Sequence, residues 1–206
     1  MYIRRYAIAL LMTLMLPLQG GEVLDKIVGN MGKITSVKSD FRQEKRLKSF
    51  AFPLKITGSM YIEHSKERVA WIRKEPMKSR CIIRGNTLEQ WDGDSGKVVT
   101  IDGNRNDALK ALFSTLRQLF AGDIKKMMKD FTLEKESNPM ILAPKSGTPA
   151  EALIKQITLR FSPDWRRIEA IVLDEKNGDT TTIELINTQI NVKIEESVWQ
   201  TVPARQ

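Results

Sequence analysis

The feature that most constrains this fold is a series of short alternating segments joined by tight turns. The first of them, residues 54–63, places apolar side chains on one face and polar ones on the other. A period of two is typical of a strand with one apolar face. Further segments follow at intervals of about ten residues, which favours an antiparallel meander over strand–helix–strand units. The expected strands are 54–63, 68–74, 79–84, 87–91, 97–101, 131–135, 140–143, 153–161, 168–174, 180–185 and 190–194.

Turn residues separate these expected strands. Gly85-Asn86 and Asn177-Gly178 are hairpin signals, and the second is the strongest in the chain. Gly58 stands on the apolar face of segment 54–63. A missing side chain there suits strong bending of the strand or the close approach of another group.

Two segments change to a helical period. Residues 22–34 and 107–121 each place apolar side chains along one stripe, and Asp123 is expected to cap a further turn. One sheet with helices at two points predicts an α+β fold. A sheet of so many strands must curl, split or close. We therefore expect a strongly curved antiparallel sheet covered by amphipathic helices, and loose covering would leave an apolar cavity.

The chain offers little catalytic chemistry. It has one cysteine, Cys81, within an apolar run, and one histidine, His64. These two residues make neither a Cys/His metal cluster nor a histidine-centred triad. Glycine-rich phosphate loops do not occur in the sequence. The acid pairs Asp92/Asp94 and Glu195/Glu196 fall in turns or near a strand end, where solvated carboxylates are expected. We predict a binding protein, not an enzyme, with no cofactor and no metal.

The formal net charge is +8. Lysines and arginines are spread along the chain beside acids, as Lys45-Arg46 are beside Glu44. This mixture is typical of a solvated surface, so we expect no nucleic-acid partner.

The N-terminus has the pattern of a secretory signal. Residues 1–5 are basic, and Tyr6–Leu18 is almost wholly apolar but shorter than the span of about 20 residues that crosses a bilayer. We expect a signal peptide of residues 1–21 and a single secreted domain of residues 22–206. An uncleaved anchor is the alternative. Because no cysteine lies directly after the apolar run, we expect no lipid on a mature N-terminal cysteine.

Short motifs follow one another in a fixed order through most of residues 22–192. Ser39–Gln43 reads S-x-F-x-Q, and Gly58–Ile62 reads glycine followed by a hydrophobic strand. Arg68–Trp71 is followed by Pro76, and Asp174 with residues 177–181 is similar to a D-x-x-G-x-x-T hairpin. No single motif is specific, but the series resembles the bacterial outer-membrane lipoprotein carrier (LolA-like) family.

This resemblance implies an incomplete β-barrel closed by a helical lid over an apolar cavity for acyl chains. Members of the family carry lipoproteins across the periplasm from an inner-membrane exporter to an outer-membrane acceptor. The resemblance therefore implies a monomeric periplasmic carrier, a divergent paralogue whose partners are these two proteins and an acylated lipoprotein or a related lipid. A periplasmic lipid-sensing or protein-interaction module that uses the same curved sheet is the alternative.

Apolar side chains from both the sheet and the helical lid are expected to line this cavity. The sheet candidates are Leu54, Ile56, Met60, Ile62, Val69 and Trp71, and the lid candidates are Leu112, Phe113, Leu116 and Phe120. The best-known carriers place an Arg-Pro pair just before the tryptophan-bearing strand, and that arginine engages the lid. The corresponding turn here is residues 64–67, so His64 is the candidate for a lid switch.

Overall fold

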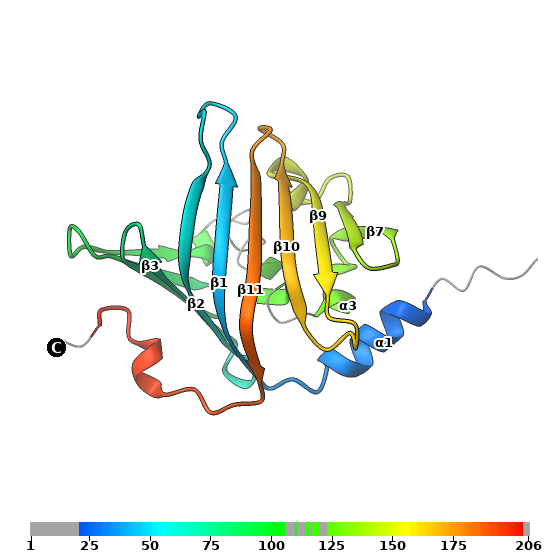
Figure 1. Ribbon diagram of the computed structural model, residues 1–206, viewed down its shortest axis with the longest axis horizontal. Helices are drawn as coiled ribbons and strands as arrows, with labels where there is room; N and C mark the ends of the chain where they lie inside the picture. The colour runs from blue at the N-terminus through cyan, green and yellow to red at the C-terminus, as the bar shows by residue number, and fades with distance from the viewer. Residues whose placement is uncertain (1–20, 106–109, 111–113, 116, 120–122, 204–206) are drawn as a thin grey trace, which may run out of the picture.

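A single antiparallel sheet dominates the computed structural model, which describes residues 21–105, 110, 114–115, 117–119 and 123–203. The strands are β1 (Ser36–Arg46), β2 (Leu54–Glu63), β3 (Arg68–Glu75), β4 (Ser79–Arg84), β5 (Thr87–Asp92), β6 (Val98–Asp102), β7 (Phe131–Lys135), β8 (Met140–Pro144), β9 (Ile154–Phe161), β10 (Ile168–Glu175) and β11 (Thr180–Ile190). They form one eleven-stranded sheet in the order β6-β5-β4-β3-β2-β1-β11-β10-β9-β8-β7. The sheet curves strongly, and among the described strands its edges β6 and β7 do not pair (Figure 1). The predicted fold class is confirmed.

The strand predictions are mostly confirmed, with two differences. β1 was not predicted as a strand because its inner-facing Ser39 breaks the apolar alternation; the Ser39 hydroxyl donates to the Ile186 carbonyl at 3.0 Å. The prediction of two strands at 180–185 and 190–194 is wrong, because β11 runs unbroken to Ile190. The polar residues between 185 and 190 belong to this strand. They lie where its pairing with β1 shifts register, and Asn187 there has a φ of 55°.

One face of the sheet, which we call the inner face, carries the main core. Phe41, Met60 and Val69 point to this face, together with the buried Ile157 and Ile171. Phe41 lies directly over Gly58, where an added Cβ would meet the Phe41 ring at 2.7 Å and the Ile72 carbonyl oxygen at 2.1 Å. The predicted close approach at Gly58 is thus confirmed.

Short helices accompany the sheet. They are α1 (Glu22–Met31), α3 (Ile124–Met127), η1 (His64–Lys66), η2 (Gly103–Arg105), η3 (Pro149–Ala152) and η4 (Glu196–Trp199). α1 buries Ile27 and Met31, and the Glu136 carboxylate accepts hydrogen bonds from the first backbone N–H groups of the helix. The Asp123 carboxylate caps α3 by accepting from the Lys126 N–H at 3.2 Å, as predicted.

The predicted helix at 107–121 is only partly described. Its residues 110, 114–115 and 117–119 are helical, and Leu119 is buried in the main core. In the described part of the chain, no helix has the length and apolar character needed to cross a membrane. The predicted signal peptide lies outside the described residues, apart from Gly21.

The C-terminal segment packs on the opposite, outer face of the sheet. Trp199 is 2% exposed and packs against Ala70 and Ile82. The Arg68 guanidinium stacks 4.1 Å from the centre of the Trp199 ring and donates to the Glu196 carboxylate. Hydrogen bonds from Arg68 and Lys66 lower the pKa of Glu196 to about 2. The tail is therefore held by both apolar burial and charge-assisted hydrogen bonds.

We expect Gly58→Ala to lower the free energy of unfolding by about 2 kcal/mol or more, because its Cβ would collide with the backbone of β3. Urea unfolding measures this change. Gly29→Ala is the matched control, since nothing lies within 4 Å of an added Cβ there and the residue is within α1. We expect the control to be neutral or slightly stabilising. Equal effects of the two substitutions would contradict the packing described at Gly58.

We expect Trp199→Ala to destabilise the protein by about 3 kcal/mol, because a buried indole and its stacking on Arg68 are lost. Val202→Ala, at a residue 50% exposed in the same tail, is expected to change stability by less than about 0.5 kcal/mol. An unfolding midpoint that Trp199→Ala leaves unchanged would show that the tail adds no stability.

Candidate ligand cavity

An apolar cavity of about 310 Å³ lies between the helical residues Thr115 and Leu119 and the inner face of β9 and β10. Its apolar lining comes from Leu119, Ala152, Leu153, Ile154, Ile157 and Leu173. Its remaining lining includes Glu175, Lys176 and Asn177 at the β10–β11 turn, of which Lys176 and Asn177 are exposed. The cavity therefore has an apolar interior and a polar rim.

Strand pairing explains the apolar lining. Ile157 of β9 and Leu173 of β10 are antiparallel partners, so their side chains point to the same face. Leu119 covers this face and is 1% exposed. Leu153 precedes β9 and is 49% exposed, which places it at the rim. The volume is at the lower end of the range of about 300–1,000 Å³ typical of ligand sites.

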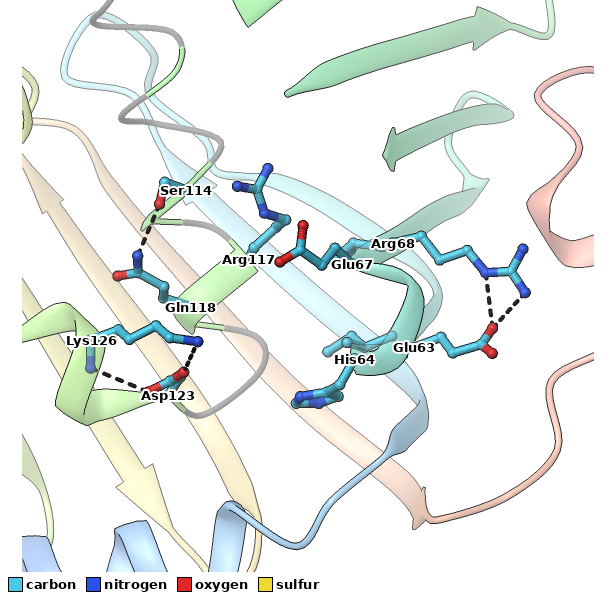
Figure 2. A pocket seen from close by; sticks show the side chains of 11 residues that line it. Glu63, His64, Glu67, Arg68, Ser114, Arg117, Gln118, Asp123 and Lys126 are labelled. Atoms are coloured by element: carbon cyan, nitrogen blue, oxygen red, sulfur yellow. Dashed lines mark hydrogen bonds and ion pairs between the residues drawn. The ribbon is translucent and has the colours of Figure 1, made fainter. Parts of the chain in front are cut away.

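A second cavity of about 300 Å³ is polar and contains His64 (Figure 2). Glu67 and Arg68 border it from the sheet side, and Asp123 and Lys126 border it from the α3 side. Most of these charges are paired: Lys126 Nζ is 2.8 Å from an Asp123 carboxylate oxygen, and Arg68 Nε donates to Glu63 at 2.9 Å. This cavity is unsuited to an acyl chain, because its lining is largely charged.

Burial lowers the pKa of His64, an effect that Asp123 opposes and Lys126 reinforces. Its Nε2 atom is buried and has no hydrogen-bond partner among the described residues. The neutral imidazole is therefore favoured. Arg117, from the helical residues on the far side of the polar cavity, donates to the Gly85 carbonyl in the β4–β5 turn. This bond ties the helical residues to the sheet at a point other than His64.

The predicted sheet residues occupy different places. Ile56, Met60, Ile62 and Val69 are buried in the main core, and Trp71 is half-buried and stacks on Phe41 with ring centres 4.0 Å apart. Ile62 and Val69 also line the polar cavity. Leu54 is instead 41% exposed, because it begins β2 beside the β1–β2 turn. Contact of these side chains with a ligand stays a prediction. The predicted lid residues Leu112, Phe113, Leu116 and Phe120 lie outside the described residues.

Sequence reasoning missed most of the apolar cavity. The alternation in 153–161 and the expected strand 168–174 that follows it could have placed Ile157 and Leu173 on one face of a hairpin. Nothing local in the sequence shows that Leu119 lies over this pair. That contact depends on how the helical residues dock on the sheet.

The described residues provide no evident reactive centre. Burial raises the pKa of the Cys81 thiol to about 11, so it stays protonated at neutral pH. No group of three or more His, Cys, Asp or Glu side chains among the described residues could hold a metal ion.

The family model for the outer membrane lipoprotein carrier protein LolA matches residues 32–201. The chain belongs to this family. No curated protein matches the chain.

The chain is similar to several solved structures. An uncharacterized conserved protein from Thermus thermophilus is 11% identical with a TM-score of 0.52, and the match covers 90% of this chain and 98% of that chain. A LolA superfamily protein from Nitrosomonas europaea is 10% identical with a TM-score of 0.46, over 86% of this chain and 96% of that chain. The MucA/MucB complex of Pseudomonas aeruginosa is 14% identical with a TM-score of 0.48, over 86% and 59%. At such identities, the likeness to the Thermus protein supports the fold alone.

We expect acid to destabilise the protein through His64. Its pKa is depressed in the folded state, whereas the unfolded chain protonates near 6.5, so the free energy of unfolding falls as the pH drops below that value. Urea unfolding at about pH 7.5 and about pH 5.5 measures the loss, and we expect a smaller loss in His64→Gln. An identical pH dependence in the two proteins would contradict the burial of the imidazole.

Proposed function

We propose that this protein is a periplasmic carrier that holds the acyl chains of a lipoprotein or a related lipid in the apolar cavity. The observation that carries the proposal is the apolar cavity between helical residues and the inner face of the sheet in a member of the LolA family. Each methylene moved from water into such a lining yields about 0.8 kcal/mol, so a chain can be held without covalent chemistry.

The rim suits the polar end of an acylated ligand. Lys176 and Asn177 are exposed at the β10–β11 turn, where a backbone or headgroup stays hydrated. The volume of about 310 Å³ suits part of a lipid. We propose that longer chains enter when the helical residues Thr115 and Leu119 move away from β9 and β10.

The direction of transport is also part of the proposal. A signal peptide at residues 1–21 would deliver the chain to the periplasm. Family membership supports an inner-membrane exporter as donor and an outer-membrane acceptor as recipient. In this role the chain acts by binding and releasing its cargo, without a chemical step.

The test is native mass spectrometry and lipid extraction of the protein purified from its own periplasm. We expect a bound lipid, and a rise in melting temperature when an acylated lipopeptide is added to stripped protein. Leu173→Trp should lower lipopeptide binding roughly tenfold or more, because the indole fills the cavity. Val99→Trp on β6, where Val99 is 57% exposed, is the matched control and should bind like the wild type.

Two outcomes would count against this proposal. Protein that carries no lipid and shows no thermal shift would favour the alternative, an interaction module retained by a protein partner. Equal lipopeptide binding by wild type and a folded Leu173→Trp would place the ligand outside this cavity.

A further inference from the structure

The turn between β1 and β2 exposes an unusual amount of apolar surface. Phe52 is 85% exposed, Phe50 67% and Leu54 41%. We call residues 47–54 the Phe tip. A backbone hydrogen bond from Phe50 N to Leu47 O, 3.0 Å long, holds its turn. Single exposed apolar residues are ordinary, but a cluster on a projecting turn indicates a surface that binds something.

The Phe tip lies among lysines without acidic partners. Lys48 within the tip and Lys55 directly after it are exposed, and neither makes an ion pair among the described residues. The acids near it are already engaged: Glu44 pairs with Arg46 at 2.7 Å, and the Asp179 carboxylate accepts from the Lys48 N–H at 2.9 Å and from the Asn177 side-chain amide at 2.9 Å. The sequence from Lys45 to Lys55 contains no acid at all. Exposed aromatics among unpaired cations are complementary to an anionic lipid surface.

A second turn joins this surface. The Lys48 N–H donates to the Asp179 carboxylate at 2.9 Å, which ties the Phe tip to the β10–β11 turn. Figure 1 shows the two turns side by side at one end of the sheet. Lys176 of that turn is exposed and adds a third lysine that makes no ion pair within the described part of the chain.

The same end of the sheet carries the rim of the apolar cavity. Lys176 lines the cavity, and its N–H donates to the Leu153 carbonyl at 3.0 Å. Leu153 is half-exposed at the same rim. The Phe tip and the cavity rim thus share one end of the molecule through the β10–β11 turn.

We propose that this end docks on an anionic phospholipid surface. Phe50 and Phe52 enter the boundary between headgroups and acyl chains, and Lys48, Lys55 and Lys176 face lipid phosphates. Docking in this orientation turns the cavity rim towards the bilayer. An acyl chain can then pass between the apolar cavity and the bilayer. The inference deepens the proposed function and in that respect rests on it, but membrane docking is measurable without any cargo.

The test is co-sedimentation of the protein purified from the periplasm with two kinds of vesicle. One is pure phosphatidylcholine, and the other is an equal mixture of phosphatidylcholine and phosphatidylglycerol. We expect binding to the mixed vesicles, weakened by salt. The double substitution Phe50→Ser/Phe52→Ser should weaken that binding roughly tenfold or more.

Two further variants sharpen the result. Val98→Ser/Val99→Ser removes exposed apolar side chains from the edge strand β6 and should bind mixed vesicles like the wild type. Lys48→Gln/Lys55→Gln/Lys176→Gln should reduce the preference for phosphatidylglycerol while the aromatics remain. Circular dichroism confirms that each variant is folded.

Three outcomes would overturn the docking proposal. They are equal binding to both kinds of vesicle, unchanged binding of Phe50→Ser/Phe52→Ser, and absence of binding by the wild type. If the wild type binds no vesicle but the Phe variant loses a cross-link to a membrane protein, the tip serves a protein partner and lipid docking is wrong.

Failure here can be separated from failure of the carrier proposal. The lipid content of Phe50→Ser/Phe52→Ser should equal that of the wild type, because its cavity is intact. Leu173→Trp should lose lipopeptide binding and still bind vesicles. If the wild type and its variants bind vesicles but none of them carries a lipid after purification, the docking proposal is supported and the carrier proposal is contradicted.

Discussion

The contact between the Phe41 ring and Gly58 is the one on which the shape of the sheet depends. No side chain fits at residue 58, because a Cβ would lie 2.1 Å from the Ile72 carbonyl oxygen. The aromatic ring takes that space, and Trp71 stacks on it with ring centres 4.0 Å apart. The pairing of β2 with β3 is irregular at this same point. An aromatic stack over a glycine thus lets the strands curve around their own inner face.

The two faces of the curved sheet pack against different parts of the chain. The inner face holds the main core and, under the helical residues, the apolar cavity. The outer face is covered locally by the C-terminal tail, where Trp199 is buried beneath a clamp of arginine and glutamate side chains. Charged groups gather at the end of the sheet near His64, whereas the apolar cavity opens near the β10–β11 turn. The polar and the apolar cavity therefore lie at different ends of the sheet.

Much of the fold could be predicted from periodicity. β2, β4 and β7 begin and end where the alternation of side chains predicts. β1 was missed because its buried Ser39 is polar, and its hydroxyl is satisfied by β11 far along the chain. Leu54 follows the alternation but is exposed, because the strand continues beyond the core at the Phe tip. The site was predicted less well, since Leu119, Ile157 and Leu173 come together only through docking of separate elements.

The sequence by itself determined the alternating strands, the turns between them and the scarcity of catalytic groups. These are local properties, because side-chain period and turn chemistry depend on neighbouring residues. Only the tertiary structure decided that β1 pairs with β11, that the tail covers the outer face and that a cavity remains under the helical residues. A cavity is the space left between elements distant in sequence, so its position depends on their packing and not on any one segment.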